Sequence, residues 1–261
     1  MIHKLLADKP TKLFVLLCSF FVANALIAEC IGGKLFSLER VFGLEPQPFT
    51  LFGEPGLTFT LTAGVLLWPL EFIMTDIVNE YFGPKAVRRI SYTAVALICY
   101  AFLMFYLAIN VPADRGFWLG SQQKEGVPDM QAAFTGVFGQ GMWIIAGSLI
   151  AFLVSQLVDV YVFHKIKKVT GERKVWLRAT GSTVVSQLVD SFVVLFIAFK
   201  IGKHWSYQRV ISICLVNYSY KFVMAILLTP VIYLIEKAIE RYLGPGTTRM
   251  MKESAMGKVN E

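Results

Sequence analysis

The sequence predicts an all-α integral membrane protein, a single helical bundle of six transmembrane helices with both termini in the cytoplasm. Three observations predict this class. Hydrophobic residues make up 56% of the 261 residues and charged residues only 16%, whereas soluble domains carry about 25% charged residues. Six apolar segments reach the length of about 20 residues that crosses a bilayer as a helix. The number of basic residues between these segments alternates along the chain.

The six predicted spans leave almost no sequence for a soluble domain. They cover residues 12–34, 58–80, 91–111, 138–164, 177–201 and 209–235. We therefore expect one transmembrane domain over residues 1–243, followed by a polar cytoplasmic tail at 244–261 that is predicted to be disordered. Two long loops, 35–56 and 112–136, receive no functional assignment from the sequence.

The excess of basic residues is predicted to set the orientation in the membrane. Seventeen Lys and Arg residues lie in the two terminal segments and in the loops after the second and fourth spans, and seven lie in the alternate loops. Basic residues accumulate on the cytoplasmic side of membrane proteins. The net charge of +7 is therefore explained by topology, and we expect no nucleic-acid partner.

Motifs for nucleotide hydrolysis, hydrolytic catalysis and metal binding are absent from the sequence. It contains no G-x-x-x-x-G-K-[ST], no G-x-S-x-G and no H-E-x-x-H. The four cysteines form no C-x-x-C pair, and the three histidines lack the spacing of metal ligands. We expect no catalytic residue, no metal and no cofactor.

The pentapeptide Ser-Gln-Leu-Val-Asp occurs twice, once in the fourth and once in the fifth predicted span. Helical spacing places its Ser, Gln and Asp on one side of the helix and its Leu and Val on the other. A charged side chain at bilayer depth has to face protein or water rather than lipid. We therefore expect both copies to line a substrate cavity, with the residues Ser155, Gln156, Asp159, Ser186, Gln187 and Asp190.

The two spans that carry this repeat are predicted to be antiparallel neighbours joined by a short basic loop, and their two aspartates are predicted to lie at different depths. At 1.5 Å per residue, Asp159 is about 8 Å and Asp190 about 20 Å from the cytoplasmic ends of their spans. Substrate sites of transporters usually lie near the midplane, so Asp190 is predicted to accept hydrogen bonds from the substrate. Asp159 is predicted to line or brace the inner vestibule, and a structural ion pair with the lysines of 165–168 stays open for it.

The second span carries an unusual number of polar residues. Asp76 and Glu80 are separated by four residues and share one helix face, and Asn79 is adjacent to Glu80. We expect Asp76 and Asn79 to contact substrate, and Glu80 to pair with two arginines at the cytoplasmic edge. A mid-span proline would free a backbone carbonyl, as in helices that break to line a site. Structural or gating roles are assigned to Pro69, Glu80, Arg88 and Arg89.

The sixth span contains a lysine far from both of its ends. Lys221 follows Asn217 by four residues, so both lie on one helix face. A buried lysine needs an anionic partner or a shifted pKa, and Asp190 and Asp76 are the candidate partners. Asn217 and Lys221 are therefore assigned to the substrate cavity.

The second span also resembles the signature P-x-x-F-x-x-T-D-x-x-x-E-x-x-G-x-x-x-x-R of the VUT family, the queuosine-precursor transporters. The matching residues are Pro69, Phe72, Thr75, Asp76, Glu80, Gly83 and Arg88. The helix at Ser186–Ser191 and the last span, with Lys221, Thr229 and Pro230, are similar to later elements of that family. The resemblance covers about residues 57–235.

The resemblance implies a bacterial inner-membrane protein that imports 7-deazaguanines, namely preQ0, preQ1 or queuine, for tRNA queuosine synthesis. The pyrimidine ring of such a base carries adjacent N–H donors, which one carboxylate accepts together. Gln156 or Gln187 can bind its carbonyl edge. The expected partners are the base and the lipid bilayer.

Two other classes of function remain open beside a self-contained transporter. The chain could be the substrate-capture subunit of an importer driven by a separate ATPase module, although such a module is not expected. It could also be an intramembrane enzyme that uses a pair of buried aspartates. A homodimer is left open as an assembly.

The topology can be tested with reporter fusions. A reporter fused after Glu261 is expected to be active on the cytoplasmic side, and the same reporter within 112–136 is expected on the opposite side, because basic residues are retained inside. The measurement is the activity ratio of a pair of reporters that are active on opposite sides of the membrane. A C-terminal fusion that reports outside would exclude this orientation.

Overall fold

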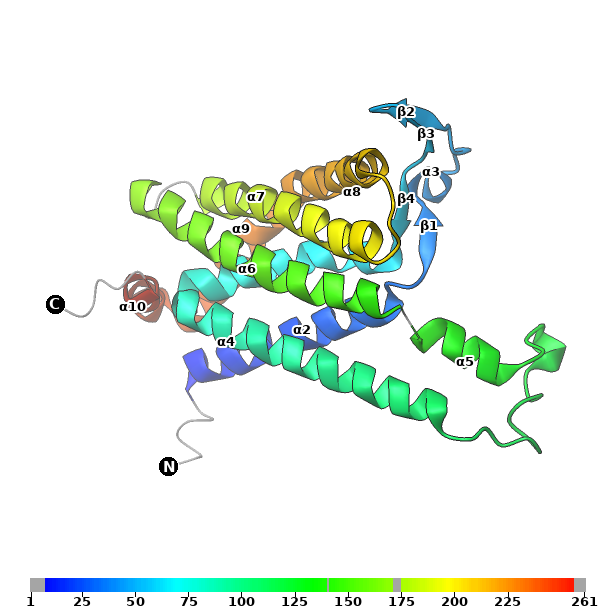
Figure 1. Cartoon of the computed structure of the whole chain (residues 1–261). Coiled ribbons are helices and arrows are strands. Elements are labelled where there is room, and N and C mark those ends of the chain that lie inside the picture. The colour runs from blue at the N-terminus through cyan, green and yellow to red at the C-terminus, as the bar shows by residue number, and fades with distance from the viewer. Residues whose placement is uncertain (1–7, 140, 171–174, 256–261) are drawn as a thin grey trace.

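The structure is a computed structural model that describes residues 8–139, 141–170 and 175–255 (Figure 1). Its long helices lie side by side and give the molecule one main axis (Figure 1). The π-helical turn η3 continues α7 without a loop. The long elements are α2 (Lys9–Ile31), α4 (Trp68–Asn110), α6 (Met142–Thr170), α7 (Val175–Leu195), η3 (Phe196–Ile201) and α8 (Tyr207–Leu227).

Short elements occupy the two ends of the bundle. One end carries two antiparallel strand pairs, β1 with β4 and the hairpin of β2 with β3, and we call it the hairpin end. The opposite end carries the last helix, and we call it the α10 end. The short elements are β1 (Leu35–Ser37), α3 (Leu38–Val41), β2 (Phe49–Leu51), β3 (Glu54–Leu57), β4 (Thr60–Thr62), η1 (Ala63–Leu66), η2 (Gln123–Glu125), α5 (Met130–Phe138), α9 (Thr229–Leu243) and α10 (Pro245–Ala255).

Burial in the bundle is inverted relative to a water-soluble protein. Many large apolar side chains are exposed on the helices, such as Leu16, Phe20, Leu103 and Leu227. Backbone and charged groups cannot be solvated by lipid, so polar side chains of a membrane protein gather inside. The buried ionisable residues are Glu29, Glu71, Asp76, Glu80, Asp159, Lys167, Arg178, Asp190, Lys221 and Glu236. This distribution confirms the predicted all-α membrane class.

Within the described ranges, five helical segments are long and apolar enough to cross a membrane. The second and third predicted spans both lie in α4. Because α4 is a single element, they count as one of the five segments. Its backbone leaves the helical region at Gly83 (φ 79°, ψ 176°), and the two arms on either side of this break run back alongside each other (Figure 1). The five segments are Lys9–Ile31, Trp68–Asn110, Met130–Thr170, Leu177–Ile201 and Tyr207–Leu227.

Several predicted boundaries were wrong. Residues 58–67 contain β4 and η1, so the helix predicted at 58–80 begins only at Trp68. The helix predicted at 209–235 ends at Leu227, and α9 begins at Thr229 with a proline in its first turn. The tail predicted to be disordered contains α10, whose residues Pro245–Ala255 are helical; residues 256–261 lie outside the described ranges.

Helices α6 and α7 pack closely because a glycine brings their backbones together. A Cβ atom on Gly147 of α6 would lie 3.1 Å from the carbonyl oxygen of Val194 and 3.3 Å from the backbone nitrogen of Ala198. Small residues allow such close approach between membrane helices. The contact places the start of α6 beside the end of α7 and η3, so the two helices are antiparallel neighbours.

Replacing Gly83 by Ala is expected to destabilise the protein by about 1–3 kcal/mol, because a residue with a Cβ is strained at this positive φ. The new Cβ would also lie 3.3 Å from the carbonyl oxygen of Ala255 in α10. Thermal unfolding in detergent measures the effect. The matched control is Gly136→Ala in α5, where the added Cβ would meet nothing within 4 Å. Equal melting temperatures for the two variants would contradict the strain argument.

Candidate functional site

The two Ser-Gln-Leu-Val-Asp copies face each other across the contact between α6 and α7. The hydroxyl of Ser186 donates a hydrogen bond of 3.0 Å to Oδ1 of Asp159, so the first residue of one copy lies beside the last residue of the other. In this antiparallel register, Asp190 is level with Ser155. The prediction that both copies belong to neighbouring antiparallel helices is confirmed.

The predicted difference in depth between the two aspartates was too large. Helix α6 continues to Thr170, six residues beyond the predicted end of the span. Asp159 is therefore about 16 Å from the end of its helix, at 1.5 Å per residue. Because Asp159 is level with Ser186, it is only one helical turn, about 6 Å, from the level of Asp190.

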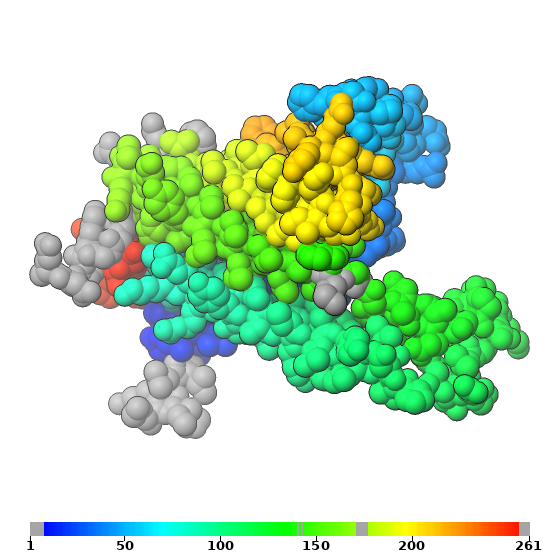
Figure 2. Space-filling model, in the orientation of Figure 1, coloured from blue at the N-terminus to red at the C-terminus, as the bar shows by residue number. Residues whose placement is uncertain are grey.

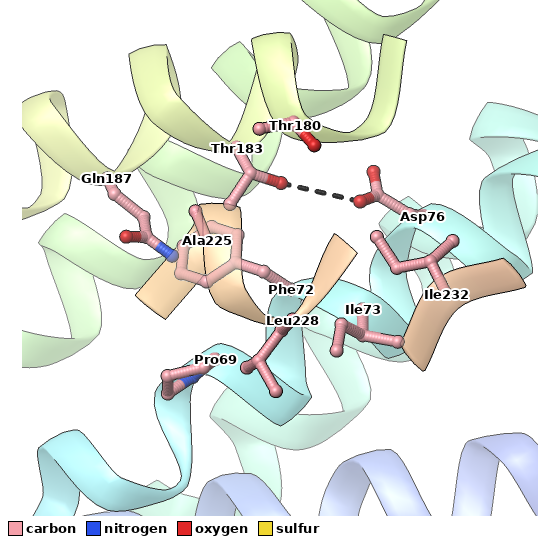
Figure 3. A pocket seen from close by; sticks show the side chains of 10 residues that line it. All are labelled: Pro69, Phe72, Ile73, Asp76, Thr180, Thr183, Gln187, Ala225, Leu228 and Ile232. Atoms are coloured by element: carbon pink, nitrogen blue, oxygen red, sulfur yellow. Dashed lines mark hydrogen bonds between the residues drawn. The ribbon is translucent and has the colours of Figure 1, made fainter. Parts of the chain in front are cut away.

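A third carboxylate, Asp76, joins this site from the first arm of α4. The hydroxyl of Thr183 on α7 donates to Oδ2 of Asp76 at 3.3 Å, as the dashed line in Figure 3 shows. Asp76 and Asp159 lie close enough to interact electrostatically, and the Ser182 hydroxyl lies within reach of both carboxylates. Thr183 and Ser182 were not predicted from the sequence, because lone hydroxyl residues are common in membrane helices.

Neither of these two carboxylates has a basic partner in the part of the chain that the structure describes. Asp76 is 3% exposed and Asp159 is fully buried, yet the ion pairs among the described residues include neither of them. Two nearby carboxylates repel each other, and burial strengthens that repulsion. A ligand that donates N–H groups or carries positive charge would reduce it.

Buried polar atoms without a hydrogen-bond partner gather at this crossing of α4, α6 and α7. Such atoms are rare in folded proteins, and each one calls for an explanation. Gln156 shows the pattern, because its Oε1 accepts from the Thr75 hydroxyl at 3.1 Å while its amide nitrogen has no partner. The atoms in this group are Asp76 Oδ1, Asn79 Nδ2, Gln156 Nε2, Asp159 Oδ2, Gln187 Oε1 and Ser191 Oγ.

A narrow pocket opens beside these atoms, between α4, α7, α8 and α9 (Figure 3). Asp76 and Thr183 form its polar side, and Phe72 lies across it. Its volume of about 10 Å³ holds about one water molecule, so binding a larger ligand requires its walls to separate. The lining residues are Pro69, Phe72, Ile73, Asp76, Thr180, Thr183, Gln187, Ala225, Leu228 and Ile232.

Lys221 and Asp190 form a buried ion pair between α8 and α7. The ammonium nitrogen of Lys221 is 2.6 Å from Oδ2 of Asp190, which confirms one of the two partners predicted for this lysine. The Asn217 amide nitrogen donates to the carbonyl oxygen of Ile213 within its own helix. The prediction that Asp190 accepts hydrogen bonds from a substrate stays untested, but its carboxylate is engaged by Lys221 in this conformation.

Glu80 has different partners from those predicted. It binds Lys167 of α6 at 2.9 Å and Arg178 of α7 at 2.7 Å, rather than Arg88 and Arg89. Those two arginines are exposed on the second arm of α4 and form no ion pair with any described residue. The prediction was wrong because Gly83 turns the chain away, so residues near in sequence point elsewhere.

The Glu80 cluster extends to the α10 end of the molecule. Lys252 of α10 lies 3.3 Å from Glu236 and 3.1 Å from Glu240 of α9, and 4.0 Å from Glu80. Burial alone would lower the pKa of the Lys252 ammonium, but the carboxylates of Glu236 and Glu80 outweigh it and raise that pKa above its usual value. The cluster therefore joins α4, α6, α7, α9 and α10.

The remaining predicted residues of α4 have structural partners. Asn79 Oδ1 is 2.8 Å from a ring nitrogen of His164 on α6. Pro69 lies in the first turn of α4, where a proline removes no helical hydrogen bond, so the predicted mid-helix break at this residue was wrong. Glu71, one turn before Thr75, accepts from the amide of Asn24 on α2 at 2.9 Å. The sequence analysis did not assign Asn24.

Comparisons with known proteins place the chain in a family. Residues 62–235 match the family described as "Putative vitamin uptake transporter". The chain is 32% identical over 190 residues to the "Probable queuosine precursor transporter" of Bacillus subtilis, covering 70% of this chain and 74% of that protein. It is 29% identical over 176 residues to the "Queuosine precursor transporter" of Escherichia coli, covering 65% of this chain and 70% of the relative.

A third relative is the "Probable queuosine precursor transporter" of Haemophilus influenzae, 27% identical over 204 residues, which cover 76% of this chain and 77% of that protein. Among solved structures, none matches this chain significantly. Together, the apolar exterior, the buried polar crossing and these relatives define a multi-pass membrane transporter rather than an enzyme. The chain belongs to the vitamin uptake transporter family that its second-span signature predicted.

Stability measurements should separate the two kinds of buried carboxylate on α4. Glu80→Gln is expected to lower the free energy of unfolding by about 3–5 kcal/mol, because it removes the buried carboxylate that pairs with Lys167 and Arg178. Asp76→Asn, one turn away, strands no cation and is expected to keep or raise stability. Thermal unfolding of both purified variants in detergent is the measurement. The distinction is wrong if Asp76→Asn loses as much stability as Glu80→Gln.

Proposed function

We propose that the protein imports queuosine precursors across the bacterial inner membrane as a self-contained transporter. The family assignment and the names of the relatives support this proposal. The observation that carries the site is the group of buried polar atoms without a hydrogen-bond partner at the crossing of α4, α6 and α7. Their chemistry complements a 7-deazaguanine base.

The proposed contacts follow from hydrogen-bond complementarity. The pyrimidine ring of the base carries adjacent N–H donors and one carbonyl oxygen. The unpartnered oxygen of Asp76 or Asp159 accepts the N–H groups, and the amide nitrogen of Gln156 donates to the carbonyl. An unpaired buried polar group costs about 1–3 kcal/mol, so a base that pairs several of them is bound favourably. Phe72 offers an aromatic face to the ring.

This assignment differs from the one made on the sequence alone. Asp190 was the predicted acceptor, whereas the proposal gives that role to Asp76 and Asp159 and leaves Asp190 with Lys221. The reason is availability, because an acceptor already bound to an ammonium group at 2.6 Å has to break that pair first. Asp190 and Lys221 then border the site on its hairpin side.

A choice among precursors is also suggested by the two unpaired carboxylates. The aminomethyl group of preQ1 is an ammonium at neutral pH, while the nitrile of preQ0 is neutral. One carboxylate can bind the ring N–H groups and the second can bind the ammonium, which also relieves their mutual repulsion. We therefore propose that the site binds preQ1 more tightly than preQ0.

The proposed topology counts the two arms of α4 as separate spans. Six spans then place both termini and the α10 end in the cytoplasm, and the hairpin end outside. The Glu80 cluster lies between the site and the cytoplasm, where it closes the route. Substrate would pass from the hairpin end toward the α10 end after the narrow pocket widens.

Uptake and binding of individual bases test the proposal. Cells that lack their own precursor synthesis and transporter are expected to regain queuosine in tRNA when they express the protein and receive preQ1. Asp76→Asn and Asp159→Asn are each expected to weaken preQ1 binding by tenfold to a hundredfold, at about 1.4 kcal/mol per decade. Binding is measured on purified protein by calorimetry.

The matched control for these variants is Asp129→Asn. Asp129 caps α5 through a 3.0 Å hydrogen bond from the backbone nitrogen of Ala132, and asparagine caps helices equally well. This variant is expected to bind preQ1 as the unchanged protein does. Normal preQ1 binding by both site variants would refute the placement of the base between α4, α6 and α7.

A further inference from the structure

A second and larger pocket lies at the hairpin end, between the two strand pairs and the adjoining ends of α7, η3 and α8. Its volume is about 340 Å³, within the range of roughly 300–1,000 Å³ that small-molecule sites occupy. In Figure 2 the blue residues of the strand pairs and the gold start of α8 cover this end of the molecule. Unlike the narrow pocket, this one is open wide enough for a small ring.

The hairpin β2–β3 is tied over the start of α8. Phe52 and Gly53 both have positive φ, 50° and 79°, as a two-residue type I′ turn requires. The turn brings the carbonyl oxygen of Phe52 onto the side-chain amide of Gln208, and the carbonyl oxygen of Leu51 accepts from the Ser212 hydroxyl at 2.9 Å. The loop is therefore a fixed wall of the pocket.

The polar wall of this pocket is a carboxylate that can change partners. Glu54 on β3 is 3.5 Å from the guanidinium of Arg209, with side chains 23% and 49% exposed. Ion pairs this exposed contribute about 0–1 kcal/mol, so a ligand can replace the arginine at little cost. Arg209 has a second support, because its guanidinium lies 4.3 Å from the ring centre of Trp205.

The remaining walls combine aliphatic and hydroxyl side chains. Leu57, Ile213 and Val216 provide apolar surface, while Thr58 and Thr60 provide hydroxyl groups, whose oxygens lie 2.8 Å from each other. Sites for small planar ligands have this composition, mostly apolar with a few polar groups that fix the orientation.

The floor of this pocket leads to the site already described. Asn217 of α8 and Leu195 of α7 line it. Lys221 follows Asn217 by one helical turn, and Asp190 precedes Leu195 on α7, so their ion pair lies directly beneath. Beyond that pair, the same faces of α7 and α8 present Gln187 and Ala225 to the narrow pocket. The three features thus follow one another along a single path.

We propose that the pocket at the hairpin end is an outer binding site that holds the planar base before transport, with Glu54 accepting its N–H groups and the Lys221–Asp190 pair separating it from the inner site. This rests on the proposed function. The ring lies against the aliphatic walls, and its N–H edge takes the place of Arg209 on Glu54. Sequence alone could not show this site, because its two halves are about 150 residues apart.

Protection of an engineered thiol from labelling tests the outer site. Thr60→Cys places a thiol on an exposed residue that lines the pocket, in a background without the four native cysteines. Thr50→Cys is the matched control, because Thr50 is exposed on β2 outside the pocket lining. With preQ1 added outside intact cells, labelling by a membrane-impermeant maleimide is expected to slow at least fivefold for Thr60→Cys and to stay unchanged for Thr50→Cys.

A second substitution in the labelled protein identifies the carboxylate. Adding Glu54→Gln to Thr60→Cys is expected to abolish protection by preQ1, whereas Glu45→Gln, an exposed acid in the same loop, is expected to leave it intact. Protection that survives Glu54→Gln, or that is equal at both cysteines, would overturn the outer site.

Uptake of preQ1 by the same cells separates this inference from the proposed function. Uptake without any protection of Thr60→Cys would overturn the outer site and leave the transport function standing. Protection without uptake would support a binding site at the hairpin end and overturn transport. Absence of both would overturn both.

Discussion

The pairing of Glu80 with Lys167 and Arg178 is the interaction on which the arrangement of the bundle depends. Burying a charge in a membrane protein is tolerable only with a partner, and here one carboxylate binds cations from two other helices. It thereby fixes α4 against α6 and α7 at the level where their polar faces meet. Because the cluster satisfies its own charges, the neighbouring Asp76 and Asp159 can remain unpaired and available to a ligand.

The class of the protein and most of its polar residues could be predicted from the sequence, because they follow from local properties. Apolar runs and basic loops are visible without a structure, and the repeated Ser-Gln-Leu-Val-Asp faces were correctly placed on neighbouring helices. The ion-pair partners of these polar residues could not be predicted, because they depend on where the backbone turns. Gly83 turns α4 so sharply that Glu80 meets residues about 90 positions away instead of Arg88. The end of α8 at Leu227 was missed because the apolar pattern resumes directly after Thr229 and Pro230, so these two residues were read as part of one span.

The site could be predicted as a set of residues but not as a geometry. Sequence depth alone ranked Asp190 above Asp159, since the end of α6 was placed six residues too early. The structure brings both aspartates within one turn of the same level and gives Asp190 to Lys221. The hydroxyls of Thr183 and Ser186 donate hydrogen bonds to the carboxylates of Asp76 and Asp159. These contacts join different helices, so they become visible only when α7 is placed against α4 and α6.

The first arm of α4 has a further consequence for the surrounding lipid. It runs from Trp68 to the break at Gly83, about 24 Å at 1.5 Å per residue, whereas the hydrocarbon core of a bilayer is about 30 Å thick. The apolar 3₁₀ turn η1 (Ala63–Leu66) continues this arm at the hairpin end. Its four residues, at about 2 Å each, bring the apolar length close to the thickness of the hydrocarbon core. A membrane of different thickness would therefore act on the contact between η1 and α2, where a Cβ atom on Gly64 would lie 2.7 Å from the carbonyl oxygen of Ala28.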